Sequence, residues 1–144
     1  MIKFLTWVPA VMILAAVMYK PVNEATQTKT VNKNLSFAIY KSDPYASGVY
    51  NNTLAEVHIT VEKVNTSGKH TIVWDKKLDS KSLSQYPSVE NALKQNITVH
   101  DVNPKKEHLA VYYTLTYNSK GSELRMWEST IVKESNFEKV DIEI

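Results

Sequence analysis

The segment from His108 to Ile131 constrains the fold more than any other part of the chain. Apolar side chains occupy every second position of its first arm: Leu109, Val111, Tyr113, Leu115 and Tyr117. This period of two is typical of a half-buried β-strand. The residues 118–121 that follow favour a turn, because Asn bonds back to its own backbone and Gly accepts a positive φ without steric cost. The segment therefore predicts a β-hairpin.

A turn over Asn118–Gly121 gives the hairpin a register with apolar side chains opposite one another. On the inner face this register has three pairs: Tyr117 with Ser122, Leu115 with Leu124, and Tyr113 with Met126. A consistent apolar face is what fixes register in a half-buried sheet. We expect this face to contact the core.

The same register brings large side chains together on the opposite face of the hairpin. It pairs Thr114 with Arg125 and Tyr112 with Trp127. Tyr, Trp and Arg are the residue types that carry most binding energy at interfaces, so these four residues are candidates for a surface that binds a protein or stacks on a sugar ring. The competing interpretation is that another segment of the chain covers the aromatic pair, since large exposed apolar patches are uncommon on monomers.

The same alternation predicts further strands along the chain. They fall at 35–41, 54–64, 70–74, 97–102 and 140–144. Trp74 shares a predicted strand face with Ile72 and is expected in the core, and 88–95 can form a short helix with Ser88 as its N-cap. About seven short strands and one short helix indicate an all-β protein, an antiparallel β-sandwich whose architecture resembles the immunoglobulin-like or transthyretin-like arrangement. An eight-stranded barrel is the alternative.

The start of the chain predicts export. Lys3 precedes an apolar run over 4–18, which is typical of a signal peptide and shorter than the roughly 20 apolar residues of a spanning helix. The residues after the run fit a cleavage site poorly, so 1–20 is expected to be a signal peptide or an N-terminal anchor. Residues 21–34 are polar and predict a flexible tether, which leaves 35–144 as the sandwich domain. An exported chain without cysteine fits the bacterial periplasm, cell surface or secreted space.

The polar segment 42–53 predicts a long connection between two strands. It carries Tyr45 and Tyr50. Loops of this length are often functional, so both tyrosines are candidates for ligand or partner binding. They could instead anchor the loop to the edge of the sandwich.

Patterns for catalysis, metals and cofactors are absent from the sequence. The histidines are dispersed, although Glu56, His58 and Glu62 share one strand face and could hold a surface metal. His100 and Asp101 are adjacent on a predicted strand and point to opposite faces, which suits a catalytic pair poorly. No metal or other cofactor is expected. The 17 basic and 15 acidic residues give a net charge of +2 without a basic stripe, which argues against a nucleic-acid partner.

These observations favour an exported, non-catalytic β-sandwich that recognises a protein or a glycan. A membrane contact is expected only through the N-terminal segment. One alternative is a small hydrolase or metal-dependent enzyme that uses His58 or His100. The other is a structural component of an envelope complex that an uncleaved N-terminus anchors to the membrane.

Overall fold

The computed structural model describes residues 29–42, 50–132 and 135–144, and these residues form strands almost throughout. The strands are β1 (Val31–Tyr40), β2 (Thr53–Asn65), β3 (His70–Lys77), β4 (Lys81–Ser82), β5 (Leu93–Val102), β6 (Glu107–Ser119), β7 (Ser122–Val132) and β8 (Phe137–Glu143). Two single turns of 3-10 helix, η3 (Leu83–Gln85) and η4 (Val89–Asn91), lie between β4 and β5. The expected signal peptide or anchor over 1–20 lies outside the described residues.

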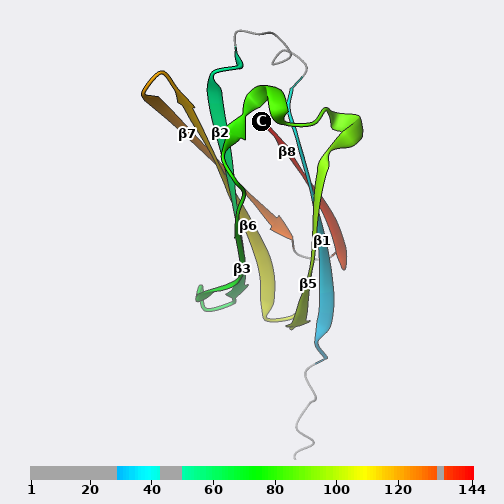
Figure 1. The fold of residues 1–144 in the computed structure, drawn as a ribbon. Coiled ribbons are helices and arrows are strands. Elements are labelled where there is room, and N and C mark those ends of the chain that lie inside the picture. The colour runs from blue at the N-terminus through cyan, green and yellow to red at the C-terminus, as the bar shows by residue number, and fades with distance from the viewer. Residues whose placement is uncertain (1–28, 43–49, 133–134) are drawn as a thin grey trace, which may run out of the picture.

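The described strands form two separate sheets that pack face to face (Figure 1). One sheet has the order β3-β2-β6-β7, with the short β4 beside β2, and the other has the order β5-β1-β8. Neighbouring strands are antiparallel apart from β1 and β8, which run parallel. The predicted β-sandwich is confirmed, and the barrel alternative is wrong because the two sheets do not join into one.

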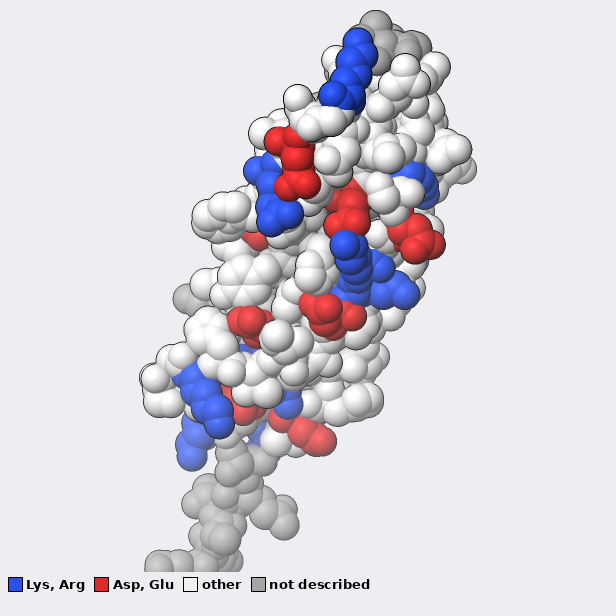
Figure 2. All heavy atoms as spheres, turned by 60° about the vertical axis from the view of Figure 1, so that its left-hand side comes forward, with Lys and Arg blue, Asp and Glu red and all other residues white. Residues whose placement is uncertain are grey.

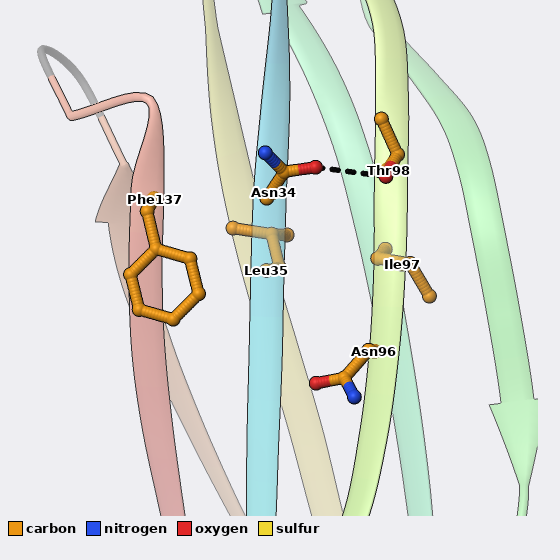
Figure 3. Close-up of a pocket in the computed structure, with 6 residues that line it drawn as sticks. All are labelled: Asn34, Leu35, Asn96, Ile97, Thr98 and Phe137. Atoms are coloured by element: carbon orange, nitrogen blue, oxygen red, sulfur yellow. Dashed lines mark hydrogen bonds between the residues drawn. The ribbon is translucent and has the colours of Figure 1, made fainter.

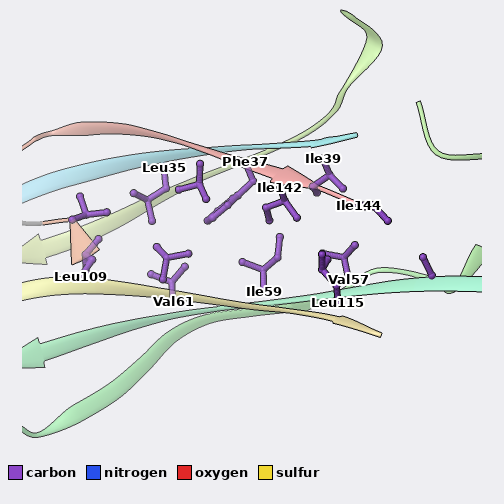
Figure 4. Close-up of a cluster of buried hydrophobic side chains, with 14 of the residues drawn as sticks. Leu35, Phe37, Ile39, Val57, Ile59, Val61, Leu109, Leu115, Ile142 and Ile144 are labelled. Atoms are coloured by element: carbon purple, nitrogen blue, oxygen red, sulfur yellow. The ribbon is translucent and has the colours of Figure 1, made fainter. Parts of the chain in front are cut away.

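The core lies between the inner faces of the two sheets (Figure 4). The three-stranded sheet contributes Leu35, Phe37, Ile39, Val99, Val140 and Ile142, and the five-stranded sheet contributes Ala55, Val57, Ile59, Val61, Leu109, Val111 and Leu115. Trp74 closes one side of this core, as the sequence predicts. Its ring stacks on Phe37 at a centroid distance of 5.4 Å and an interplanar angle of 5°, so an aromatic pair connects the two sheets there.

The prediction that Trp74 and Ile72 share a face is wrong. Val61 pairs with Trp74 and Glu62 pairs with Ile72, so β3 carries one extra residue, Val73, at this point. A β-bulge of this kind shifts the alternation by one residue. Trp74 therefore points into the core, whereas Ile72 points outward and is 61% exposed.

The hairpin is confirmed, but its predicted register is wrong by two residues. The turn contains only Lys120 and Gly121, both with positive φ (50° and 84°), and Ser119 pairs with Ser122. Two positive φ values are the signature of a type I′ turn, whose twist matches that of the flanking strands. A register shift of two residues keeps each side chain on its predicted face but changes its partner. The observed pairs are Tyr117 with Leu124, Leu115 with Met126, Thr116 with Arg125, Thr114 with Trp127, and Tyr112 with Ser129.

The predicted helix over 88–95 is also wrong. Ser88 makes no side-chain capping bond, and η4 ends after one turn. From Leu93 the chain is extended, because Leu93, Lys94 and Gln95 pair with β1. Two isolated helical turns are marginal in water, and a ladder with a central strand is the more stable choice.

The first and last strands begin earlier than the sequence predicts. β1 starts at Val31, within the segment expected to be a tether, and β8 starts at Phe137. Lys33 is the reason the pattern is misleading at β1, because this lysine is buried and its Nζ donates a hydrogen bond to the carbonyl oxygen of Ser135 at 2.7 Å. A long side chain can bury its stem while its ammonium group is satisfied by a backbone oxygen.

Candidate binding surfaces

The outward-pointing side of the five-stranded sheet, which we call the outer face, carries the four hairpin residues predicted as a site. Tyr112 and Thr114 reach it from β6, and Arg125 and Trp127 reach it from β7, since alternate residues of a strand point to the same side. Figure 1 shows η3 at the top of the molecule between the two sheets and η4 beside the upper end of β5, both away from this side. None of the described elements covers the outer face.

Trp127 is the most exposed large apolar residue of the described chain, at 74%. It lies opposite Thr114 and diagonal to Tyr112, so the two rings are neighbours and do not face one another directly as the predicted register implies. Diagonal neighbours in an antiparallel pair are roughly 7–8 Å apart, within reach of aromatic side chains. Ile131, which is 57% exposed, continues the same row of β7. Tyr112 is half-buried between them and the neighbouring strands.

Charged side chains of both signs also lie on the outer face. Figure 2 shows them interspersed over the side of the molecule that carries the five-stranded sheet, without a block of either sign. Arg125 pairs with Glu123 at 3.1 Å, and Lys77 pairs with Glu56 at 3.0 Å. The outer face is therefore a mixed polar surface, on which Trp127 and Ile131 are the exposed apolar residues of β7 and Ile72 is exposed on β3.

Two histidines of the outer face, His58 and His70, each contact one carboxylate. His58 Nε2 lies 2.9 Å from Asp75 Oδ1, and His70 Nδ1 lies 2.7 Å from Glu62 Oε2. The hydroxyl of Thr60 also donates to Asp75, and these two bonds, that of Thr60 first, lower the pKa of the Asp75 carboxyl. No cluster of three metal-ligating side chains occurs in the part of the chain that the structure describes.

His100 and Asp101 lie at a β-bulge of β5. Val31 pairs with Val102 and Lys33 with Val99, which leaves one extra residue on β5, and Asp101 has a φ of 54°. The ammonium group of Lys63 donates to the carbonyl oxygens of both bulge residues, at 2.8 and 3.0 Å. Asp101 accepts a hydrogen bond from the Thr30 hydroxyl. These hydrogen bonds stabilise the backbone of the bulge.

A shallow groove crosses the outer side of the three-stranded sheet (Figure 3). It has a volume of about 390 Å³, and its lining residues come from three adjacent strands: Asn34, Leu35, Asn96, Ile97, Thr98 and Phe137. The Thr98 hydroxyl donates to Asn34 Oδ1 at 2.8 Å, which fixes the amide orientation. Phe137 is 60% exposed and lies on the same side of the sheet as the Asn34 amide.

The sequence did not predict this groove, because Asn34 fell within the expected tether and Phe137 fell outside the strand expected at 140–144. The available signal was the pair of Asn-x-Ser/Thr sequences at Asn34 and Asn96. Both lie on the paired strands β1 and β5, where Asn34 is opposite Thr98 and Ser36 is opposite Asn96.

Of the two loop tyrosines predicted as site residues, the structure describes only Tyr50. Tyr45 lies outside the described residues. Tyr50 is partly buried and packs against the core. Its ring therefore anchors the end of the loop, which is the second of the two roles expected for it.

A cleft of about 210 Å³ separates the edge strands β7 and β8. Tyr113 lines this cleft and donates a hydrogen bond from its hydroxyl to Glu128 across the hairpin. Burial, followed by this bond, raises the pKa of the Tyr113 phenol. Tyr113 was expected on the inner face, and the structure confirms this placement.

Comparison of the chain with protein-family models, curated proteins and solved structures gave no match. Among the described residues, none of the helices has the length and apolar character needed to cross a membrane.

Proposed function

We propose that this protein is an exported, non-catalytic binding module that recognises a protein partner through the outer face. The observation that carries the proposal is the 74% exposure of Trp127 on an uncovered sheet face, beside Tyr112, Ile131 and Arg125. Leaving an indole in water forfeits the free energy that its burial would provide, on the order of 1.5–3 kcal/mol for a large apolar side chain. A partner that covers the row recovers this free energy.

The outer face also has the rigidity that recognition favours. β6 is flanked by β2 along its full length and by β7 on the other side, so Tyr112 and Thr114 stand on a central strand. A site built on paired strands orders few new degrees of freedom on binding and so loses little conformational entropy. Aromatic and Arg side chains surrounded by polar residues match the composition of interface centres.

Photo-cross-linking in the cells that produce the protein tests the proposal. A photoreactive amino acid replaces Ser129, which lies beside Tyr112 on the outer face, and in a matched control it replaces Thr66 in the turn after β2. We expect a discrete cross-linked product with a different protein, identified by mass spectrometry, from position 129 only, and its loss when Tyr112→Ala and Trp127→Ala are added. The proposal is wrong if position 129 gives no product or only a product of two copies of this chain, or if the double substitution leaves the product unchanged.

The groove of the three-stranded sheet favours a second candidate, binding of a glycan. An exposed phenyl ring beside the amides of Asn34 and Asn96 and the hydroxyl of Thr98 offers an apolar platform together with neutral donors and acceptors, which suits a sugar ring. Electrophoresis in gels that contain soluble xylan, mannan or dextran tests it. Retardation that Phe137→Ala abolishes and Trp127→Ala preserves would support a glycan site here, and unretarded migration in all three gels would exclude it.

A further inference from the structure

Strand β7 is an edge strand that is exposed along nearly its whole length. Ten of its eleven residues are exposed, and only the last one, Val132, is buried. Large apolar side chains are exposed on both of its faces: Leu124 and Met126 on the side toward the core, Trp127 and Ile131 on the outer face. Within the described residues, β7 pairs with β6 alone. An exposed apolar edge is a template for pairing with another strand.

The free backbone groups of this edge can be assigned from the hydrogen bonds of the sheet. Leu78 N–H donates to the carbonyl of Val57, so the odd-numbered residues of β2 bond toward the β3 side. Because backbone groups alternate in direction along a strand, the even residues of β2 bond to the even residues of β6 that lie opposite them, for example Thr60 to its register partner Tyr112. The odd residues of β6 then bond to the even residues of β7. The turn gives the same assignment, because Ser119 and Ser122 flank a two-residue turn and such flanking residues are hydrogen-bonded to each other.

The N–H and C=O groups of the odd residues of β7 therefore point away from the sheet. These residues are Glu123, Arg125, Trp127, Ser129 and Ile131. Their side chains lie on the outer face. A strand added at this edge would continue the outer face and place its own side chains directly beside Trp127.

We propose that a second copy of this chain occupies the edge, with the two β7 strands antiparallel about a two-fold axis at Trp127. The two five-stranded sheets then become one continuous sheet across the dimer. Trp127 is the central residue of the strand Ser122–Val132, so this register pairs all of β7 with all of its counterpart. A closed two-fold dimer pairs the β7 edges of both copies at once, and closed two-fold symmetry is the commonest form of a homo-oligomer.

Charge disfavours two of the nearby registers, and the full overlap of the two strands favours Trp127 over the others. Opposed residues in an antiparallel pair share a face, so the two-fold axis can only move by whole residues along β7. An axis at Arg125 would place two guanidinium groups opposite each other, and one at Glu128 would do the same with two carboxylates. Like charges directly opposite are destabilising. With the axis at Trp127, Arg125 faces Ser129 of the second copy and Glu123 faces Ile131.

Glu128 does not protect the edge, although inward-pointing charges often do so in natural sheets. It points to the core side of β7, where its carboxylate accepts the hydrogen bond of Tyr113 from the same molecule. Its charge is thereby held over its own sheet. In the dimer it would lie opposite Met126 of the second copy.

Sedimentation of the full chain tests the edge contact with one backbone substitution. Ser129→Pro removes an N–H that β6 does not use, and proline is tolerated in edge strands at such positions. We expect the wild type and the control Ser129→Ala to be dimers and Ser129→Pro to be a monomer with an unchanged circular dichroism spectrum. A monomeric wild type at millimolar concentration, or a dimeric proline variant, would overturn the proposal.

A charge exchange tests the two-fold axis and does not depend on the proline variant folding. Trp127→Lys and Trp127→Glu each place like charges opposite one another and should be monomeric at low salt, whereas a mixture of the two should form a heterodimer. Ile72→Lys is the matched control, because this exposed residue lies on the outer face of the opposite edge strand, and it should stay dimeric. If the mixture stays monomeric, the axis is not at Trp127. The proposed binding function does not depend on this dimer, since Ser129→Pro leaves the side chains of Tyr112 and Trp127 in place.

Discussion

At the scale of the residue, Tyr86 shows how a polar atom can be buried without losing its hydrogen bond. The ring is 1% exposed, and its hydroxyl donates to the backbone carbonyl of Ala55 at 3.0 Å. Tyr86→Phe leaves that carbonyl without this donor, so we expect the free energy of unfolding in urea to fall by about 1–2 kcal/mol. Tyr112→Phe is the control, because no hydrogen bond of the Tyr112 hydroxyl to a described residue is present, and its effect should lie within about 0.5 kcal/mol. Equal losses in the two variants would contradict this account.

The same residue makes stability depend on alkaline pH. Burial, and after it the negative charge of Glu56, raises the pKa of Tyr86 from 10.0 to about 12. A phenol whose pKa is raised by folding stabilises the folded state fully below the unfolded value, and this contribution is lost as the pH rises through the folded value. Stability should therefore decline between pH 10 and about pH 12. The decline should be shallower in Tyr86→Phe, which unfolding in urea at a series of pH values would measure.

At the scale of the element, the β6–β7 turn carries a residue that is not the best for its conformation. Lys120 has a φ of 50° at the first position of a type I′ turn, where Asn is strongly preferred. Lys120→Asn should raise the free energy of unfolding by about 0.5–1 kcal/mol, because a non-glycine residue other than Asn or Asp is strained in the left-handed region. Gly121 has a φ of 84° and open space around it, so Gly121→Ala should lower stability by about 1–2 kcal/mol through backbone strain alone. Opposite signs in urea unfolding are the expected result, and a destabilised Lys120→Asn would contradict it.

The elements also mark where sequence reasoning succeeds and where it stops. Alternation of apolar residues located the strands and assigned Leu115 and Tyr113 to the inner face, because the period of two is a local property of the chain. Register is not local. A turn over 118–121 and a turn of Lys120 and Gly121 alone both keep apolar residues on one face, and only the backbone twist of a type I′ turn distinguishes them. The bulges at Val73 and Asp101 were invisible for the same reason, since each depends on the partner strand.

Prediction of the candidate site also depended on which properties of the chain are local and which are not. Tyr112, Thr114, Arg125 and Trp127 were assigned to one face correctly, because a register error of two residues does not change faces. Whether that face is covered depends on how the two sheets pack, and no pattern within β6 or β7 encodes it. The groove at Phe137 was missed because it joins three strands that are distant in the sequence.

At the scale of the whole molecule, side chains between the two sheets hold the sandwich together, in a chain that contains no cysteine for a disulfide. The inner faces meet along Phe37, Ile59 and Ile142, and the Phe37 ring is the largest of these groups (Figure 4). It is fully buried and stacks on Trp74 of the other sheet. Loss of this ring therefore removes contacts to both sheets at once and should weaken the packing of one sheet on the other.

Phe37→Ala should lower the free energy of unfolding by about 3–5 kcal/mol, the usual cost of deleting a buried phenyl group and leaving a cavity. Because a domain of this size is stable by only about 5–15 kcal/mol, the variant should unfold at a much lower urea concentration and a lower temperature. Phe137→Ala is the matched control, since that ring is 60% exposed and its removal should change stability by less than about 0.5 kcal/mol. Urea unfolding followed by circular dichroism measures both variants. Comparable losses in the two would mean that Phe37 does not hold the sheets together, whereas a large loss for Phe37 alone would leave Phe137 free to be assigned to binding.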